Sequence, residues 1–259
     1  MIHPTALVHP DADISPTATI GPWASVGADV AIGASTVIES HSIIKGPTTI
    51  GADNHIFPFC SIGDAPQDKK FSESEMPSRL EIGNGNTIRE YCSINRGTPD
   101  GGGVTLLGDG NWIMAYSHIA HDCIVGSHNV FANNSTLAGH VHIADFVTLG
   151  GFSGVHQFCR LGEGSFTAIA SVIVRDVPPF VIVKGNVARP RAVNTIGLTR
   201  RGFNQADIRS VKRCFRGLYR EGRSLNAAMC VIEKEALDSC LAQKMLRFLG
   251  AVSQRGLTR

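Results

Sequence analysis

The sequence has few charged and few aromatic residues. Asp, Glu, Lys and Arg make up 18% of its 259 residues, and Phe, Trp and Tyr make up 7%. A disordered chain combines low hydrophobicity with high net charge, whereas here 43% of the residues are hydrophobic and the formal net charge is +2. The composition therefore excludes disorder and favours an aliphatic core with many turns, to which 28 glycines contribute.

Long apolar runs are also missing. No stretch reaches the roughly 18 consecutive apolar residues of a membrane span. Met1 to Pro4 lead almost directly into a repeat, and no export signal is visible there. We therefore expect a cytoplasmic protein without stable membrane insertion.

The cysteines lack the spacing of a disulfide framework or a metal cage. Their number is odd and no two of them form a CxxC motif. The seven positions are Cys60, Cys92, Cys123, Cys159, Cys214, Cys230 and Cys240. We expect all of them to be reduced and buried.

Charge is unevenly distributed along the chain. Residues 1–189 carry 10 Lys and Arg against 17 Asp and Glu, a net of −7, and residues 190–259 carry 14 against 5, a net of +9. A basic segment can meet nucleic acid, phosphates or an acidic protein. Because no nucleic-acid-binding motif is present, we expect no nucleic-acid partner.

An aliphatic residue recurs at every sixth position over most of the chain. Neither the helical period of 3.6 nor the strand period of 2 produces this spacing. It predicts a coil with three short flat sides, each placing one aliphatic side chain inside, and parallel stacking of successive coils. The inward positions are Val8, Ile14, Ile20, Val26, Ile32, Ile38, Ile44, Ile50, Ile56 and Ile62, then Ile82, Ile88 and Ile94, and then Leu107, Ile113, Ile119, Val125, Phe131, Leu137, Ile143, Leu149, Val155 and Leu161.

The repeat defines the expected domains. A glycine often follows the aliphatic residue, and we expect it to let the chain turn the corner. Polar, Gly- and Pro-containing insertions interrupt the period at 64–80 and 96–105; such loops often carry function, although the second is also consistent with a plain solvated loop. The prolines of Asp176–Pro179 suit an exit from the β-helix. We assign 1–189 to a β-helical catalytic domain and 190–259 to a basic α-helical domain, with helices capped by Asn204 and Ser224 and a third over 241–252.

Histidines gather at one level of the repeat. His118 and His121 flank the inward Ile119, and His140 and His156 follow at intervals close to one coil. Since neighbouring coils lie about 4.8 Å apart, these side chains can stack on one side. Three interpretations stay open: surface histidines, a zinc site like that of γ-class carbonic anhydrases, or a general base in which Asp122 orients His121.

Several motifs resemble those of the UDP-N-acetylglucosamine O-acyltransferases, which start lipid A biosynthesis in Gram-negative bacteria. The histidine motifs are the most specific among proteins with hexapeptide repeats. The matching segments are Tyr116–Cys123 (YSHIAHDC), Leu137–Val141 (LAGHV), Val155–Cys159 (VHQFC), Gln67–Asp68, Ile88–Glu90, Arg96–Thr98, Asp176–Pro179, Arg200–Phe203 and Arg255–Leu257. The resemblance implies a left-handed β-helix, a homotrimer with active sites between subunits, and transfer of a 3-hydroxyacyl chain from acyl carrier protein to the glucosamine 3-hydroxyl.

The resemblance also implies roles for individual residues. His121 would be the general base, Asp122 its partner, and the Gly139 N–H the donor to the oxyanion. Contacts to the sugar and acyl portions would come from Asp68, Lys70, His118 and His140. The UDP end would meet His156, Gln157, Asn194, Arg200 and Arg201. Ile169 would limit the length of the acyl chain where relatives with glycine accept a longer one.

No cofactor or metal is implied beyond the acyl carrier protein thioester. That protein is acidic, so the basic segment around Arg213, Arg216 and Arg220 is a candidate docking surface. Asn95 and Ile196 depart from the family pattern, which has histidine and glutamate there. Alternatives are another hexapeptide acyltransferase, a carbonic-anhydrase-like zinc enzyme, and a non-catalytic scaffold, which would not need His121, Gly139 and His156 to align.

Overall fold

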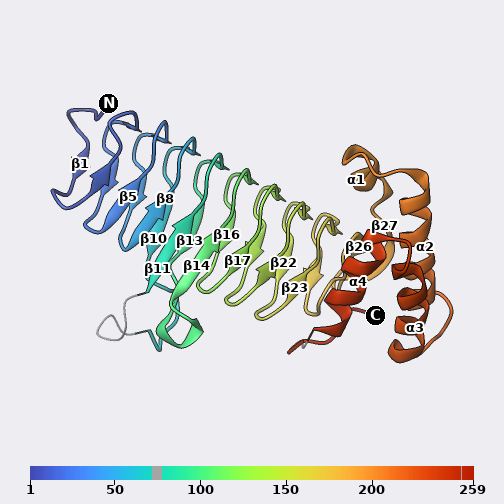
Figure 1. Ribbon diagram of the computed structural model, residues 1–259. Helices are drawn as coiled ribbons and strands as arrows, with labels where there is room; N and C mark the ends of the chain where they lie inside the picture. The colour runs from blue at the N-terminus through green and yellow to red at the C-terminus, as the bar shows by residue number, and fades with distance from the viewer. Residues whose placement is uncertain (72–77, 252) are drawn as a thin grey trace.

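The computed structural model describes residues 1–71, 78–251 and 253–259. Short strands form three parallel sheets that are the three sides of a long prism (Figure 1). Leu7 pairs with Ser25 and Val8 with Val26, so one coil takes 18 residues, or three hexads. The predicted parallel β-helix is confirmed.

Successive strands of the chain belong to successive sides. Sheet I contains β1 (Leu7–Val8), β4 (Ser25–Val26), β7 (Ile43–Ile44), β10 (Ser61–Asp64), β13 (Ser93–Asn95), β16 (His118–Ile119), β19 (Thr136–Leu137), β22 (Gly154–Val155) and β25 (Val172–Ile173). Sheet II contains β2 (Asp13–Ile14), β5 (Val30–Ile32), β8 (Thr48–Ile50), β11 (Arg79–Ile82), β14 (Val104–Leu107), β17 (Ile124–Val125), β20 (His142–Ile143) and β23 (Arg160–Leu161). Sheet III contains β3 (Thr19–Ile20), β6 (Val37–Ile38), β9 (His55–Ile56), β12 (Thr87–Ile88), β15 (Trp112–Ile113), β18 (Val130–Phe131), β21 (Thr148–Leu149), β24 (Phe166–Thr167), β26 (Val181–Lys184) and β27 (Arg189–Val193).

The aliphatic ladders fill the interior of the prism. Ile38, Ile44 and Ile56 are fully buried, as is Phe131 farther along the same core. Burying each such side chain contributes about 1.5–3 kcal/mol. The expected inward positions are therefore the core, apart from the first coil, where Val8 and Ile14 stay partly exposed because no coil precedes theirs.

The repeat glycines have a different purpose from the one expected. A β-carbon on Gly33 would lie 2.5 Å from the carbonyl carbon of Gly51 in the next coil, so glycine is needed because the coils approach closely there. The corners themselves are turned mostly by other residues with positive φ, such as Asp122 and His140, both at φ 59°. The expectation that glycine makes the turn was wrong.

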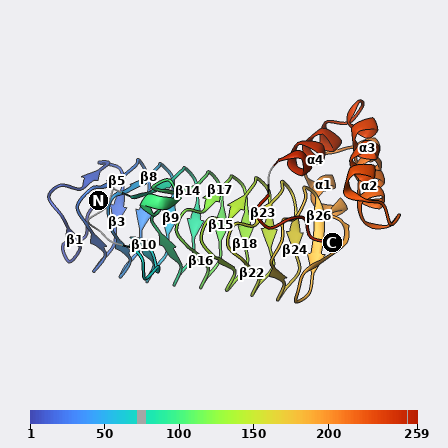
Figure 2. The same ribbon diagram turned by 90° about the horizontal axis from the view of Figure 1, so that it is seen from below.

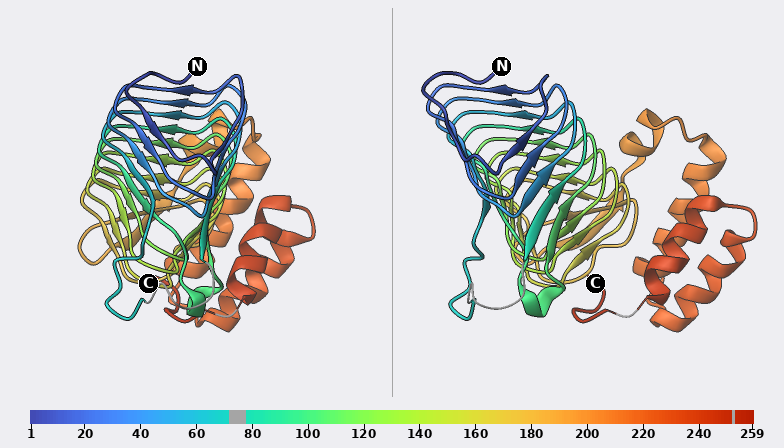
Figure 3. Two further views of the ribbon diagram at one scale, coloured as in Figure 1. Left: turned by 90° about the vertical axis from the view of Figure 1, so that its left-hand side faces the viewer. Right: turned by 60° about the vertical axis from the view of Figure 1, so that its left-hand side comes forward.

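Both insertions leave the prism at the corner where sheet I passes into sheet II, which we call the I/II corner (Figure 3). Residues 72–77 of the first insertion lie outside the described part of the chain. The second contains the short 3₁₀ helix η1 (Pro99–Gly101), with Gly102 and Gly103 at positive φ after it. The insertions therefore project from the corner that carries His121 and Asp122.

The helices gather at the C-terminal end of the prism (Figure 2). They are α1 (Thr195–Arg200), α2 (Gln205–Tyr219), α3 (Leu225–Ala236) and α4 (Cys240–Gly250). The predicted caps are confirmed: Asn204 forms a capping box with Asp207, and the Ser224 hydroxyl accepts from the Ala227 amide. Helix α1 was not expected, and the end of the third predicted helix at Val252 lies outside the described residues.

Sheet III and the C-terminal tail connect the prism to the helices. Strand β27 pairs antiparallel with β26 and extends sheet III to Val193, four residues past the expected end at 189. After α4 the chain returns to the prism, where the Asp176 amide donates to the Gly256 carbonyl and Thr258 N–H donates to Asp176. None of the helices in the described residues is long and apolar enough to cross a membrane.

The cysteines are free thiols, but not all of them are buried. Cys60, Cys92, Cys123, Cys159 and Cys214 are buried, whereas Cys230 and Cys240 are exposed. The two exposed thiols lie on α3 and at the start of α4, in a part of the chain whose helical faces are half solvated. The expectation of seven buried thiols was therefore wrong at these two positions.

Candidate active site

The site is built on the I/II corner at the level of β16 and β17. Ile119 points into the core and is 1% exposed, so the corner that follows it carries His121 and Asp122 away from the ladder. The positive φ of Asp122 turns the chain towards β17. The Asp122 amide donates to Thr105 Oγ1 at 2.8 Å, which fixes the backbone of this turn.

His121 and Asp122 form a hydrogen-bonded pair. His121 Nδ1 lies 2.7 Å from Asp122 Oδ2, and the side chains are 10% and 1% exposed. Because an ionised carboxylate only accepts hydrogen bonds, Nδ1 carries the proton of this contact, and in the neutral form of the ring Nε2 is the nitrogen with a lone pair. The pair therefore presents a proton acceptor at His121 Nε2, the arrangement that general-base catalysis requires.

Two opposing influences set the charge of Asp122. Burial raises the pKa of this carboxyl, but hydrogen bonds from His121 and Thr98 outweigh burial and hold the pKa below its ordinary value. Thr98 donates from its amide to Oδ1 at 2.8 Å and from its hydroxyl to Oδ2 at 2.6 Å. Asp122 is therefore ionised at neutral pH and can stabilise a protonated His121.

His140 lies one coil farther on and faces the same pair. Its ring is perpendicular to that of His121, with centroids 5.2 Å apart, and it stacks on Phe158 at 4.7 Å. Its Nε2 is 3.6 Å from Asp122 Oδ2. Burial lowers the pKa of His140 more than the charge of Asp122 raises it. His140 is therefore neutral at pH 7 and can donate or accept a hydrogen bond.

Gly139 lies against the imidazole of His121. A β-carbon at this position would meet Cε1 of the ring at 2.6 Å. Within the described residues, the Gly139 amide donates to no protein acceptor. An N–H group beside the base and without an acceptor suits the stabilisation of an oxyanion.

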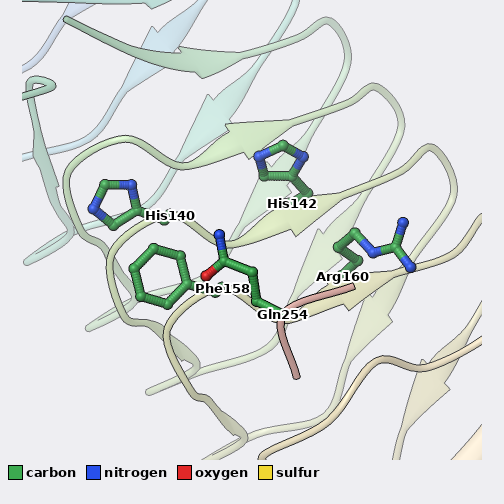
Figure 4. Close-up of a pocket in the computed structure, with 5 residues that line it drawn as sticks. All are labelled: His140, His142, Phe158, Arg160 and Gln254. Carbon is green, nitrogen blue, oxygen red and sulfur yellow. The ribbon is translucent and has the colours of Figure 1, made fainter. Parts of the chain in front are cut away.

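Two cavities meet at His140. One, of about 200 Å³, lies under the insertions and is lined by Asp68, Lys70, Phe71, Thr98, Pro99, Asp100, His121 and His140. The other, of about 260 Å³, follows the corner towards the helices and is lined by His140, His142, Phe158, Arg160 and Gln254 (Figure 4). Together they give a substrate a path from the base towards the C-terminal tail.

Three more of the predicted contact residues are His118, from the sugar and acyl set, and His156 and Gln157, from the UDP set. His118 Nδ1 is 2.7 Å from Ser93 Oγ, and burial lowers the pKa of His118, with the charge of His121 acting in the same direction. His156 is exposed two residues before Phe158. The Gln157 carbonyl accepts from Arg255 Nε at 2.7 Å, which ties the tail to the same corner.

Other predicted residues lie at different corners of the same chain. Asn194 caps α1 by accepting from the Gly197 amide, and its Nδ2 donates to the Gly164 carbonyl at 3.0 Å. Arg201 pairs with Glu163 and covers the Phe146 ring at 4.1 Å. These contacts lie at the corner between sheets II and III, and Arg200 ends α1 beside them. A single chain therefore does not bring them to His121.

Ile169 also lies away from His121. It is 69% exposed at the corner between sheets III and I. His121 lies at the I/II corner, so an acyl chain bound there is at a different corner from Ile169 of the same chain. Ile169 would limit the length of that acyl chain only from a neighbouring subunit.

Asn95 and Ile196, the two departures from the family pattern, lie on β13 and on α1. Asn95 is 4% exposed, and its Nδ2 donates to the Ala65 carbonyl at 3.0 Å, which holds the start of the first insertion. Ile196 is 65% exposed on α1. Neither side chain reaches the His121–Asp122 pair.

His121, Asp122 and His140 are the group in the described residues whose donor atoms could hold a metal ion. One atom from each lies within 4.8 Å of the others. Asp122 already accepts from His121 and from Thr98, so a cation would have to displace these hydrogen bonds. The donor set fits a metal only after that rearrangement.

Sequence reasoning missed Thr98 and Thr105 as partners of Asp122, and Arg160 and Gln254 as cavity residues. Thr98 belongs to the Arg96–Thr98 motif, for which the sequence indicates no role. Nothing in the hexad period placed the tail near His140. Arg160 donates from Nε to Asp176 Oδ2 at 2.7 Å, and that pair orders the tail.

Two family models and many curated proteins match the chain. Residues 176–258 match the family model described as UDP N-acetylglucosamine O-acyltransferase, domain 2, and residues 105–139 match the bacterial transferase hexapeptide model. The acyl-[acyl-carrier-protein]–UDP-N-acetylglucosamine O-acyltransferase of Thiobacillus denitrificans is 50% identical over 206 residues, which are 80% of this chain and 79% of that protein. The corresponding protein of Verminephrobacter eiseniae is 48% identical over 218 residues, 83% and 82% of the two chains.

Solved structures show the same fold along the whole chain. LpxA from Acinetobacter baumannii superposes with a TM-score of 0.96 at 40% identity, over 100% of this chain and 99% of that one. The UDP-N-acetylglucosamine acyltransferase of Francisella novicida gives 0.97 at 40% identity, over 100% and 94%. The β-helix is left-handed, as the resemblance implied. Both the sequence and the structure show that the chain belongs to the UDP-N-acetylglucosamine O-acyltransferase family.

Proposed function

We propose that this chain transfers a 3-hydroxyacyl chain from acyl carrier protein to the glucosamine 3-hydroxyl of UDP-N-acetylglucosamine, the first step of lipid A biosynthesis. The observation that carries the proposal is the buried His121–Asp122 pair next to Gly139, whose amide has no acceptor among the described residues, at the junction of two cavities. Membership of the family supports the choice of substrates.

The geometry suggests the order of the steps. His121 Nε2 takes the proton of the sugar hydroxyl while the oxygen attacks the thioester carbonyl. The Gly139 N–H stabilises the oxyanion, and Asp122 stabilises the imidazolium. When the intermediate collapses, the C–S bond breaks and the leaving thiolate receives the proton from His121. Atoms and charges balance without a redox partner.

The substrate contacts follow the two cavities. Asp68, Lys70 and His140 line the cavity at His121 and would contact the reacting end together with His118 on β16. His156 and Gln157 would follow along the same corner towards the tail. Asn194, Arg200 and Arg201 would bind the UDP end from a neighbouring subunit. This division supports a homotrimer with sites between subunits. Mixing His121→Ala and Arg200→Ala chains by joint refolding should recover part of the activity, whereas independent sites within each chain would recover none.

No cofactor or metal takes part in the proposed reaction. Zinc analysis of active protein should find less than one ion per site, and chelators should leave the rate unchanged. Loss of activity in a chelator and its return with zinc would instead favour a metal site at His121, Asp122 and His140. The expected cytoplasmic location stays a prediction.

The direct test is incubation with UDP-N-acetylglucosamine and a mixed pool of 3-hydroxyacyl carrier proteins, with products identified by mass. A singly acylated UDP-N-acetylglucosamine ester is the expected product. If acyl-CoA is used equally well, another hexapeptide acyltransferase activity becomes the better description. Absence of any acylated nucleotide sugar would contradict the proposal.

A further inference from the structure

The second insertion closes around the carboxylate of Asp122. Thr98, at the start of the insertion, donates to both carboxylate oxygens, at 2.8 Å from its amide and 2.6 Å from its hydroxyl. Thr105, at the other end, accepts from the Asp122 amide. The start of the second insertion therefore holds the side chain of Asp122, and its end holds the Asp122 backbone.

The middle of the loop approaches Asp122 as closely. A β-carbon on Gly101 would lie 2.1 Å from Asp122 Cγ and 2.2 Å from Oδ2. The Thr98 hydroxyl also accepts from the Gly101 amide at 3.1 Å, so the group that donates to Asp122 also holds the turn of η1. The loop therefore restricts both the position and the orientation of the Asp122 carboxylate.

We propose that Thr98 is a positioning residue: it fixes the plane of the Asp122 carboxylate so that Oδ2 faces His121 Nδ1, and the second insertion exists to supply it. The expected effect of Thr98 on kcat rests on the proposed function. The orientation of the carboxylate by Thr98 does not depend on it. It gives the Arg96–Thr98 motif a purpose at the site, and it replaces the interpretation of 96–105 as a plain solvated loop.

The need for such a residue follows from the shape of a carboxylate. Rotation about its Cβ–Cγ bond is broad and nearly two-fold, so packing alone selects an orientation weakly. Asp122 is 1% exposed, so water cannot replace a lost donor readily. Because Thr98 donates to both oxygens, the carboxylate cannot rotate about its Cβ–Cγ bond. The second acceptor site of Oδ2 then points to His121 Nδ1.

Neighbouring charges do not provide the same restraint. His140 Nε2 is 3.6 Å from Oδ2, too far for a hydrogen bond. The other titratable groups that face the pair are His118, Asp68, Lys70 and Asp100. In the described structure, Thr98 and His121 are the residues whose hydrogen bonds reach the carboxylate of Asp122.

The test compares three variants of the full chain with the wild type. Thr98→Val removes the hydroxyl at nearly constant volume, and Thr98→Ser keeps it. Thr19→Val makes the same change on β3, where Val37 already occupies the paired position one coil on. We expect Thr98→Val to lower kcat about tenfold to a hundredfold, as misplacement of a catalytic group does, with both KM values within about twofold. Thr98→Ser and Thr19→Val should stay within about twofold of the wild type in kcat.

A second measurement is independent of turnover. The downfield proton resonance of His121 Nδ1–H, assigned with His121→Gln, reports the hydrogen bond to Asp122. It should be sharp in the wild type and in Thr98→Ser, and shifted or broadened in Thr98→Val. If Thr98→Val unfolds, Gly101→Ala provides the alternative, because its methyl group displaces the carboxylate and should change the same resonance.

The outcomes separate the two proposals. A wild type without acyl transfer would contradict the proposed function, and the resonance would still decide the role of Thr98. A Thr98→Val protein with wild-type kcat and an unchanged resonance would overturn the positioning role. So would a Thr98→Ser protein as impaired as Thr98→Val, because the hydroxyl would then not be the group that matters.

Discussion

Gly139 lies directly against the imidazole of His121: a β-carbon at Gly139 would be 2.6 Å from Cε1 and 2.8 Å from Nε2 of the ring. The residue one coil above the base therefore has to be glycine for the ring to keep its place. The same contact places Gly139, whose amide is the proposed oxyanion donor, against the ring that takes the proton. Steric room and the proposed oxyanion donor come from one residue.

Gly139→Ala should lower kcat at least about a hundredfold, because the methyl group pushes the imidazole out of line. Steady-state rates with the acylated carrier protein and the nucleotide sugar measure the effect. Gly154→Ala is the control, since a β-carbon there meets no atom within 4 Å. Equal rates for wild type and Gly139→Ala would show that the ring tolerates displacement.

His121→Ala should lower kcat by about 10²–10⁴, the usual cost of losing a general base. Sedimentation should show an unchanged oligomer, because the ring is at a corner and contributes nothing to the aliphatic ladder. His9→Ala, which removes a half-exposed histidine of the first coil, is the matched control. A variant that keeps the wild-type kcat would remove His121 from the mechanism.

The basic helices should bind the acidic acyl carrier protein. Arg213 pairs with Glu235 at 2.5 Å and Arg216 with Glu221 at 3.0 Å, so reversing these charges would also disturb the helices. Within the described ranges Arg209 and Lys212 form no ion pair, and both are exposed on α2. They are therefore better probes than the arginines chosen from the sequence.

Arg209→Glu with Lys212→Glu should raise KM for the acyl donor severalfold, leave KM for the nucleotide sugar unchanged, and reduce the salt dependence of the donor KM. The control is Arg209→Ser with Lys212→Ser, which removes the two positive charges without adding negative ones. It shows whether loss of charge is sufficient or reversal is needed. Equal changes in both KM values would place the docking surface elsewhere.

Ile169→Gly should move selectivity towards longer 3-hydroxyacyl chains. Isoleucine fills space that glycine leaves open, and each CH₂ excluded from an apolar groove forfeits about 0.8 kcal/mol. The measurement is kcat/KM across a series of chain lengths for both proteins, and Ile169→Leu, of equal volume, should keep the wild-type optimum. An unchanged optimum in Ile169→Gly would remove this residue as the ruler.

Stability should fall on acidification below the ordinary histidine range. The pKa values of His118 and His140 are lowered, first by burial. The unfolded chain therefore binds protons at a pH where the folded chain does not, so the free energy of unfolding decreases as the pH falls through about 6.5 towards the lower folded values. Asp122, whose pKa is also lowered, adds a further loss at still lower pH.

Thermal unfolding at pH 7.5 and 5.5 measures this effect, and we expect a midpoint lower by a few degrees at pH 5.5. His118→Gln should reduce the difference, because glutamine does not titrate, whereas His9→Gln should not. A midpoint independent of pH over this interval would contradict the lowered pKa values of these half-buried imidazoles.

The sequence by itself determined the β-helix. A side chain buried every six residues predicts coils of three equal sides stacked in parallel, so Ile38, Ile56 and their ladder could be placed without a structure, although the hand of the coil could not. The same arithmetic placed His140 one coil beyond His121. It also predicted the caps at Asn204 and Ser224, because capping depends on residues only two or three positions apart.

The tertiary structure alone decided what surrounds Asp122. Thr98 is 24 residues away in an insertion without a period, so no spacing rule relates the two. Gln254 lines the same cavity as His140, on a tail whose path depends on the pairing of Arg160 with Asp176. Arg201 lies at another corner because it pairs with Glu163 and covers Phe146, contacts that no period predicts. Periodic contacts are encoded locally and repeated, whereas contacts between a loop and a corner exist only once the chain has folded.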